Sequence, residues 1–191
     1  VISLPNNAMR SVAPNYKIEG LTLNQLMENG DFKNKLTGYG TPVAKDIKEY
    51  DEKEGVAKVY WLRRESTNGL VYILTDKLDN YNVGDIFYLS ALVKPTKVVN
   101  ISIGVDIMNN IGDIPADKWS KVSTTGALKT EPIRVSPRVY FGNADSMNES
   151  DYMAYKYIQT FNLTQTFGAG NEPTKEWCDE HIQGYFEGIK S

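Results

Sequence analysis

The 191-residue sequence is poor in the side chains on which much enzyme chemistry depends. It contains one cysteine, Cys178, and one histidine, His181. A single cysteine cannot form an internal disulfide, and a single histidine cannot by itself build a zinc site or activate a nucleophile as a His-paired base. The presence of only one cysteine and one histidine therefore excludes many of the common catalytic and metal sites.

Long apolar runs and basic clusters are also missing. No apolar run approaches the ~20 residues needed to span a bilayer, and the amino end, VISLPNNAMR, has neither a signal-peptide core nor an initiator Met. The formal net charge is -3 and no Lys/Arg cluster stands out, whereas binding to a phosphate backbone usually leaves a basic patch. We expect a soluble, processed or excised piece that binds neither membrane nor nucleic acid.

What the sequence does contain, from Gly55 onward, is a series of short apolar runs separated by turn-forming segments. This rhythm is typical of an all-β sandwich or barrel. The segment NNIGDIPAD is interpreted as a turn, and the charged segment KDIKEYDEKEG as a solvated loop or edge. The expected strands are residues 56–63, 70–75, 86–93, 98–107, 119–124, 133–141 and 153–163, with one more near Phe32.

Two of these runs alternate between apolar and polar residues, which sends successive side chains to opposite faces of a strand. In VVNISIGVDI the apolar set runs from Val99 to Ile107, and Asn100 and Asp106 belong to the other face. In IRVSPRVYF the polar face includes Arg138 and Tyr140. We expect both strands to cover a core with one face and to present a polar, partly aromatic surface with the other.

The stretch TFNLTQTFGAGNEPTKEWCDEHI matches neither a P-loop nor a dinucleotide-binding loop, because no Lys stands in register and Pro173 replaces the third glycine. We interpret TFNLTQTF as the final strand and GAGNEP as a turn with positive φ at Gly168 and Gly170. A helix is predicted at about 175–187, capped by Thr174 and docked through its apolar stripe.

Saccharide binding is the chemistry that the remaining residues favour, because a sugar ring stacks on an aromatic plane while Asp, Asn and Arg hold its hydroxyls. For Trp61 and Trp119 core packing is the alternative, and for Arg138 a solvated outer face. Asn29 and Asp31 are candidates for a structural Ca²⁺, although no EF-hand loop is present, and no other cofactor is expected. The candidate saccharide-binding residues are Tyr60, Trp61, Arg63, Asn100, Asp106, Arg138 and Tyr140.

Several segments, in this order, resemble a known family. NQLMENGDFKNKLTGYG, VGDIFYLSALVK and DKWSKVS are similar to strands of galactose-binding-like jelly-roll carbohydrate-binding modules. The ending FNLTQTFGAGNEPT resembles the closing segment of such modules in tail and baseplate proteins of phages that infect Gram-positive bacteria, with Asn162 where the pattern usually has Asp.

The resemblance implies an antiparallel jelly-roll β-sandwich at residues 21–170, after a lead-in at 1–20 and before a helical segment at 171–191. It also implies a non-catalytic virion module that binds host cell-wall polysaccharide. The alternatives are a structural accessory that contacts other tail or baseplate proteins without binding sugar, or a polysaccharide hydrolase or esterase. A homo-oligomer is a further expectation, since tail components often assemble with rotational symmetry.

Overall fold

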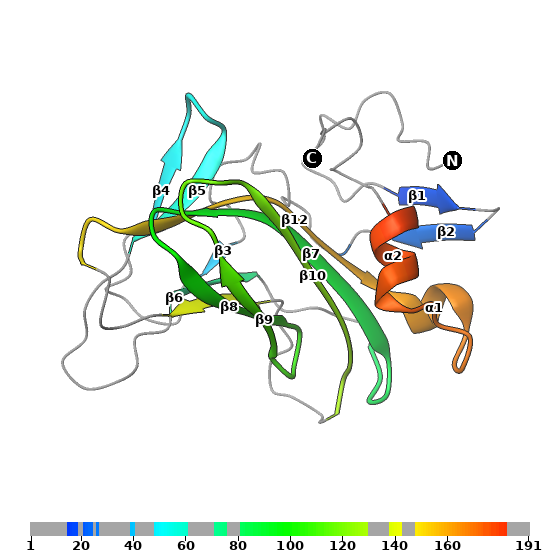
Figure 1. Ribbon diagram of the computed structural model, residues 1–191. Coiled ribbons are helices and arrows are strands. Elements are labelled where there is room, and N and C mark those ends of the chain that lie inside the picture. Colours follow the sequence, from blue (N-terminus) through cyan, green and yellow to red (C-terminus); the bar gives the residue numbers. More distant parts are fainter. Residues whose placement is uncertain are drawn as a thin grey trace.

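The computed structural model describes residues 15–18, 21–24, 26, 39–40, 48–60, 71–75, 81–129, 138–142 and 148–182. Strands dominate this part of the chain, and two short helices lie near its end (Figure 1). The strands are β1 Asn15–Ile18, β2 Leu21–Asn24, β3 Tyr39–Gly40, β4 Lys48–Asp51, β5 Val56–Tyr60, β6 Val71–Thr75, β7 Ile86–Pro95, β8 Val99–Gly104, β9 Asn109–Ile114, β10 Ser120–Ala127, β11 Arg138–Gly142 and β12 Tyr152–Asn162, and the helices are α1 Leu163–Phe167 and α2 Lys175–His181.

Ten of these strands form two five-stranded sheets, with the orders β10-β7-β12-β5-β4 and β3-β6-β11-β8-β9. All of their pairings are antiparallel. From β5 to β12 each successive strand changes sheet, except at the β8–β9 hairpin. This alternation is the connectivity of a jelly-roll sandwich, so the predicted fold class is confirmed.

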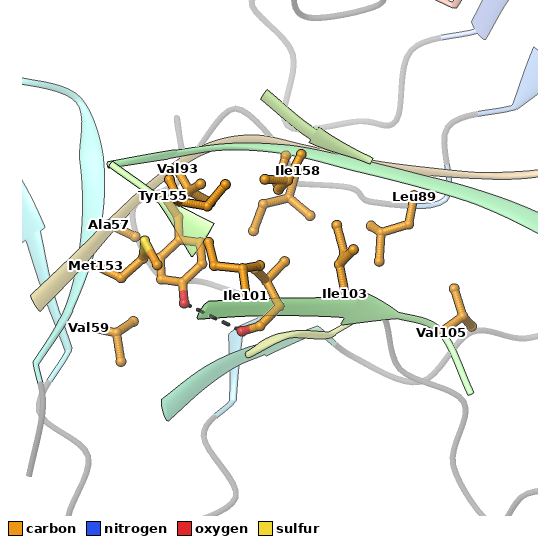
Figure 2. Close-up of a cluster of buried hydrophobic side chains, with 14 of the residues drawn as sticks. Ala57, Val59, Leu89, Val93, Ile101, Ile103, Val105, Met153, Tyr155 and Ile158 are labelled. Atoms are coloured by element: carbon orange, nitrogen blue, oxygen red, sulfur yellow. Dashed lines mark hydrogen bonds between the residues drawn. The ribbon is translucent and has the colours of Figure 1, made fainter. Parts of the chain in front are cut away.

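The main core lies between the two sheets and follows from the period-2 alternation of their strands. Figure 2 shows Val93, Tyr155 and Met153 of the first sheet facing Ile101 and Ile103 of β8. The Tyr155 hydroxyl, fully buried, donates a hydrogen bond to the Val139 carbonyl oxygen at 3.4 Å. A buried phenol needs such a partner, and this contact joins β12 of one sheet to β11 of the other.

A second buried cluster lies on the outward face of the first sheet, at one end of its long strands. There β2, α1 and α2 lie over β7 and β12, as Figure 1 shows at the side of the molecule away from β4 and β5. We call this cluster the covered end. Its buried members are Leu23, Tyr88, Phe161, Leu163, Cys178 and Ile182.

The closing segment after β12 explains how this cover is held in place. Asn162 caps α1 by accepting from the Gln165 N–H at 3.1 Å, and its Nδ2 donates to buried Asp85 at 2.7 Å. Thr164 accepts from the Ile86 N–H at 2.8 Å and donates to Glu172 at 2.6 Å. These contacts tie the closing segment to the start of β7.

The predicted turn and helix cap in this segment are confirmed. Gly168 and Gly170 have φ values of 88° and 83°, which L-residues rarely adopt. Thr174 caps α2, since its hydroxyl accepts from the Trp177 N–H at 3.3 Å. Two predicted boundaries are wrong. The final strand ends at Asn162, inside TFNLTQTF, and the rest of that string forms α1. Helix α2 ends at His181, short of residue 187.

Two sequence interpretations on the other sheet need correction. NNIGDIPAD contains a strand, β9, and is not only a turn. Ile107 does not face the core, because β8 ends at Gly104 and Ile107 is 42% exposed in the turn that follows. The turn is tight, because a Cβ on Gly104 would lie 2.0 Å from the Ile107 carbonyl oxygen. The strand expected near Phe32 lies outside the described residues.

The charged segment before β5 forms an edge strand, β4, consistent with one of the two expectations for it. Charged residues are common on such edges because they oppose pairing with other chains. At the amino end, β1 pairs with β2, so the boundary predicted at residue 20 falls between two paired strands. In the part of the chain described, neither helix has the length and apolar character to cross a membrane.

Candidate functional site

The outward face of the first sheet continues beyond the covered end and there carries lysines and aromatic rings. Ala57, Val59, Met153 and Tyr155 point into the core, so the alternating neighbours on β5 and β12 point outward. We call this surface the lysine–aromatic face. Its residues are Lys58, Tyr60, Lys94, Trp119, Tyr152, Ala154 and Lys156.

Two tyrosines form the aromatic centre of this face. Tyr60 and Tyr152 are direct partners across β5 and β12, with ring centroids 5.3 Å apart and planes tilted by 56°. Both side chains are half-buried. The Tyr60 hydroxyl donates to Glu49 Oε2 at 2.9 Å, which holds this ring from the neighbouring edge strand.

Lys58 holds the other ring. Its Nζ lies 5.0 Å from the centroid of the Tyr152 ring and donates to Asp51 Oδ2 at 2.7 Å. The lysine side chain is only 14% exposed, so its stem packs against the sheet while its charged end is paired. One chain of contacts therefore runs from Glu49 through both tyrosines and Lys58 to Asp51, and it orients both rings.

The pKa values of these groups define their charge at neutral pH. The hydrogen bond from Lys58, followed by those from the backbone, lowers the pKa of the Asp51 carboxyl. The hydrogen bond to Asp51 raises the pKa of Lys58, against the effect of burial. Burial first, and then the hydrogen bond to Glu49, raises the pKa of Tyr60. The face thus presents a neutral phenol beside a charged carboxylate and a charged ammonium group.

A second polar surface lies on the other sheet, along β8 and β9. Asn110 Nδ2 donates to Asn100 Oδ1 at 2.7 Å, and Asn100 Nδ2 donates to Asp113 Oδ1 at 3.0 Å. The Gly112 N–H donates to Asn110 Oδ1 at 2.8 Å. We call Asn100, Asn110 and Asp113 the amide row. Its groups largely satisfy one another, and their main effect is to hold the β8–β9 hairpin.

The structure divides the predicted site residues between the two sheets. Asn100, Arg138 and Tyr140 lie on neighbouring strands, since Gly142 pairs with Asn100 and Tyr140 with Ser102. Asp106 lies in the turn after β8, where its Oδ2 accepts from the Lys129 N–H at 3.0 Å. Tyr60 lies on the opposite sheet.

This division means that the seven predicted residues do not form one site. Trp61 and Arg63 lie outside the described residues, and so do the calcium candidates Asn29 and Asp31. Within the part of the chain that the structure describes, no group of three or more His, Cys, Asp or Glu side chains could hold a metal ion.

Sequence reasoning missed most of the lysine–aromatic face. Tyr152, Ala154 and Lys156 alternate with Met153 and Tyr155 in the string DYMAYKY. The period-2 pattern that predicts the two faces of β8 is present here too and is the signal that could have identified them. Trp119, for which core packing was the alternative, is half-buried with the Lys94 Nζ 5.2 Å from its ring centroid.

Comparisons with known proteins agree with this architecture. No family model and no curated protein matches the sequence. Among solved structures, the arabinose-bound α-L-arabinofuranosidase MgGH51 has a TM-score of 0.57 and 12% identity, over 85% of this chain and 30% of that one. Its likeness supports the jelly-roll β-sandwich as the fold of this chain.

Two further similarities are weaker. TmCBM61 in complex with β-1,4-galactotriose has a TM-score of 0.48 and 9% identity, over 72% of this chain and 98% of that one. The enzymatically active domain of bacteriophage CBA120 tailspike protein 4 has a TM-score of 0.44 and 13% identity, over 71% of this chain and 21% of that one. This chain thus spans less than a third of the tailspike and arabinofuranosidase chains.

Proposed function

We propose that this chain is a non-catalytic carbohydrate-binding module that recognises saccharide on its lysine–aromatic face. The observation that carries the proposal is the Tyr60–Tyr152 pair, half-buried on an outward sheet face and held from both sides by charged groups. Rings fixed in this way bind a flat ligand without losing much side-chain entropy.

A sugar fits the chemistry of the face better than a purely apolar ligand does. One side of a pyranose ring carries C–H groups that stack on aromatic planes, and its rim carries hydroxyls. Glu49 and Asp51 can accept from such hydroxyls, and Lys58 can donate to them. Because carboxylates already hold Tyr60 and Lys58, the polar groups are positioned before any ligand arrives.

The proposed setting is a phage tail or baseplate protein that adheres to the cell wall of a Gram-positive host. The ending FNLTQTFGAGNEPT, which resembles the closing segment of modules in such proteins, supports this setting. In the virion the module would contact other tail proteins and could assemble with copies of itself. Binding at the host surface would then be its role outside the cell.

A structural accessory role is the second candidate. The observation that favours it is a half-buried aromatic group at the covered end, where the rings of Trp177 and His181 stack at 4.3 Å and Phe167 meets Trp177 edge-on at 5.6 Å. Partly exposed aromatic rings are common at protein–protein contacts. In that case the module would join tail components and would bind no sugar.

A fluorescent fusion of the full chain, added to host cells and to purified wall polysaccharide, tests the proposal. We expect Tyr152→Ala to lower saccharide affinity about tenfold, since a lost stacking contact is worth roughly 1–2 kcal/mol. Ile107→Ala, which removes an exposed apolar side chain from the turn after β8, should bind as the unmodified chain does. A fusion that binds neither cells nor polysaccharide, or binding unaffected by Tyr152→Ala, would refute the proposed face.

The same assay tests for a cation and for catalysis. Because the proposed contacts are ring stacking and direct hydrogen bonds to the sugar, we expect binding to persist in EDTA. If Asn29 and Asp31 hold a structural Ca²⁺, EDTA would instead lower the melting temperature. Release of reducing ends or acetyl groups from the wall polysaccharide would contradict the non-catalytic role.

A further inference from the structure

Three lysines surround one small residue on the lysine–aromatic face. Ala154 pairs with Lys58 on one side and with Lys94 on the other. Lys156 follows two residues later on the same strand and therefore points to the same side of the sheet. Direct cross-strand neighbours have Cβ atoms about 4.5–5.5 Å apart, so the three lysine stems begin within roughly 10 Å of one another.

A β-bulge in β12 follows directly after these lysines. The register shifts between Lys156 and Gln159, and Tyr157 takes a φ of 54°. Because of the extra residue, Ile158 enters the core only two positions after outward-facing Lys156. The irregularity lies directly beside the lysines and ends the regular outward row of β12 at Lys156.

Each of the three ammonium groups lies beside an aromatic ring. Nζ of Lys58 is 5.0 Å from the Tyr152 centroid, Nζ of Lys94 is 5.2 Å from that of Trp119, and Nζ of Lys156 is 4.9 Å from that of Tyr157. Such contacts hold a cation in place without neutralising it. The three lysines therefore stand around Ala154, which is itself fully buried beneath its neighbours.

Among the residues that the structure describes, acidic partners reach these lysines from the β4–β5 side. Asp51 pairs with Lys58 at 2.7 Å, and Glu54 forms a longer ion pair with the Lys94 Nζ at 3.6 Å. None of the positions next to Ala154 in the register is acidic. Like charges gathered on one sheet face destabilise the fold, and a bound anion would remove that repulsion.

We propose that Lys58, Lys94 and Lys156 bind a negatively charged group of the saccharide, a carboxylate or a phosphate, above Ala154. This inference rests on the proposed function and names its ligand as an acidic glycan. The sugar ring carrying the anion, or its neighbour, stacks on Tyr152 or Trp119, while the anion accepts hydrogen bonds from the ammonium groups.

Isothermal titration of the full chain with four polymers tests this inference. The probes are polygalacturonate for carboxylate, a glycerol-phosphate polymer for phosphate, a neutral galactan, and single-stranded DNA. We expect one of the two acidic polymers to bind more tightly than the galactan, with an affinity that falls as salt is raised. Lys156→Gln should weaken that binding about tenfold, whereas Lys129→Gln, an exposed lysine after β10, should not.

The outcomes separate the inference from the function on which it rests. One outcome is that galactan binds as tightly as the acidic polymers, that Tyr152→Ala weakens this binding and that Lys156→Gln does not. This outcome would overturn the acidic ligand, but the chain would still be a carbohydrate-binding module. Affinity for DNA equal to that for the acidic polymer would overturn saccharide recognition by the lysines. Lys156→Arg, which keeps the charge, should retain most of the affinity, and a loss there as large as in Lys156→Gln would contradict an anion-binding role.

Discussion

The outward face of the first sheet has two ends, the covered end and the lysine–aromatic face, and strand alternation places side chains on both. Tyr88 and Lys94 both point outward from β7, and Phe161 and Tyr152 both point outward from β12. At the covered end β2, α1 and α2 bury Tyr88 and Phe161, whereas Tyr152 and Lys94 stay half-buried. Strand alternation decides which side chains leave the core, and the packing of later elements decides which of them can meet a ligand.

The covered end should respond to mutation through stability alone, and Phe161→Ala should have the largest effect. Truncating a fully buried Phe lowers the free energy of unfolding by about 3–5 kcal/mol, because the buried apolar surface of the ring is lost and a cavity is left. Urea denaturation would measure this loss, and the saccharide affinity of the protein that remains folded should be unchanged. Tyr152→Ala, on the lysine–aromatic face, should reverse this pattern by lowering saccharide affinity more than stability. A loss of only about 1 kcal/mol in the free energy of unfolding of Phe161→Ala would contradict the comparison.

The turn that positions the helices is expected to be the next most sensitive point. Gly168 has φ 88° and ψ 150°, a region open essentially to glycine, so Gly168→Ala should cost about 1–3 kcal/mol. A Cβ at Gly168 would meet Asn171 Nδ2 at 3.6 Å, an ordinary contact, so the cost is backbone strain. Thermal unfolding would measure it, with Pro173→Ala in the same turn as the control. Equal losses in the two variants would show that the strain is not specific to the glycine.

The contact between Tyr88 and Asp179 should give the covered end a dependence on acid. Burial raises the pKa of the Asp179 carboxyl, but hydrogen bonds from Lys175, Ser123 and Tyr88 together lower it below its ordinary value. The Tyr88 hydroxyl donates to Asp179 at 2.9 Å. Stability from a carboxyl with a lowered pKa is present above its unfolded pKa, near ~4, and is lost as pH falls through the folded value.

Melting temperatures between about pH 6 and pH 2 would test this coupling. We expect Asp179→Asn to be less stable than the unmodified chain at the upper end of this range, by about 1–3 kcal/mol, and to lose less stability on acidification. Glu149→Gln, an exposed change in the turn before β12, should follow the unmodified curve. Parallel curves for Asp179→Asn and the unmodified chain would refute the coupling.

The smallest effect is expected on the second sheet. Asn110 is exposed and its bonds lie within the β8–β9 hairpin, so Asn110→Ala should change stability by no more than about 0.5 kcal/mol. Saccharide affinity, measured by titration, should not change. A tenfold loss of affinity in this variant would show that saccharide binds not to the lysine–aromatic face but to the surface where Asn100 was predicted to act.

Much of the fold could be predicted from the sequence because alternation and turn residues are local signals. The elements that were missed have other sources of stability. β9 is built from turn-forming residues and depends on side-chain bonds such as Asn110 to Asn100. The single turn of α1 depends on the Asn162 cap, which the β-like string TFNLTQTF conceals.

The site was less predictable because exposure is a tertiary property. Tyr88, Tyr152 and Tyr155 all lie in similar apolar strands, yet Tyr155 faces the core, Tyr88 is covered by the helices and only Tyr152 keeps part of its ring at the surface. Alternation separates Tyr152 from Tyr155, but nothing in the local sequence separates Tyr152 from Tyr88, which the helices cover. The pairing of Ala154 with both Lys58 and Lys94 likewise requires the strand order β7-β12-β5, in which distant segments become neighbours.

The most direct test of the central claim is a backbone-amide NMR titration of the full chain with purified host wall saccharide. The claim is that the lysine–aromatic face binds saccharide, while the covered end and the amide row are structural. We predict saturable shifts at Tyr60, Tyr152 and Lys94, with little change at Phe161 or Asn110. Shifts centred on Asn100 and Asn110, with none on the lysine–aromatic face, would contradict it.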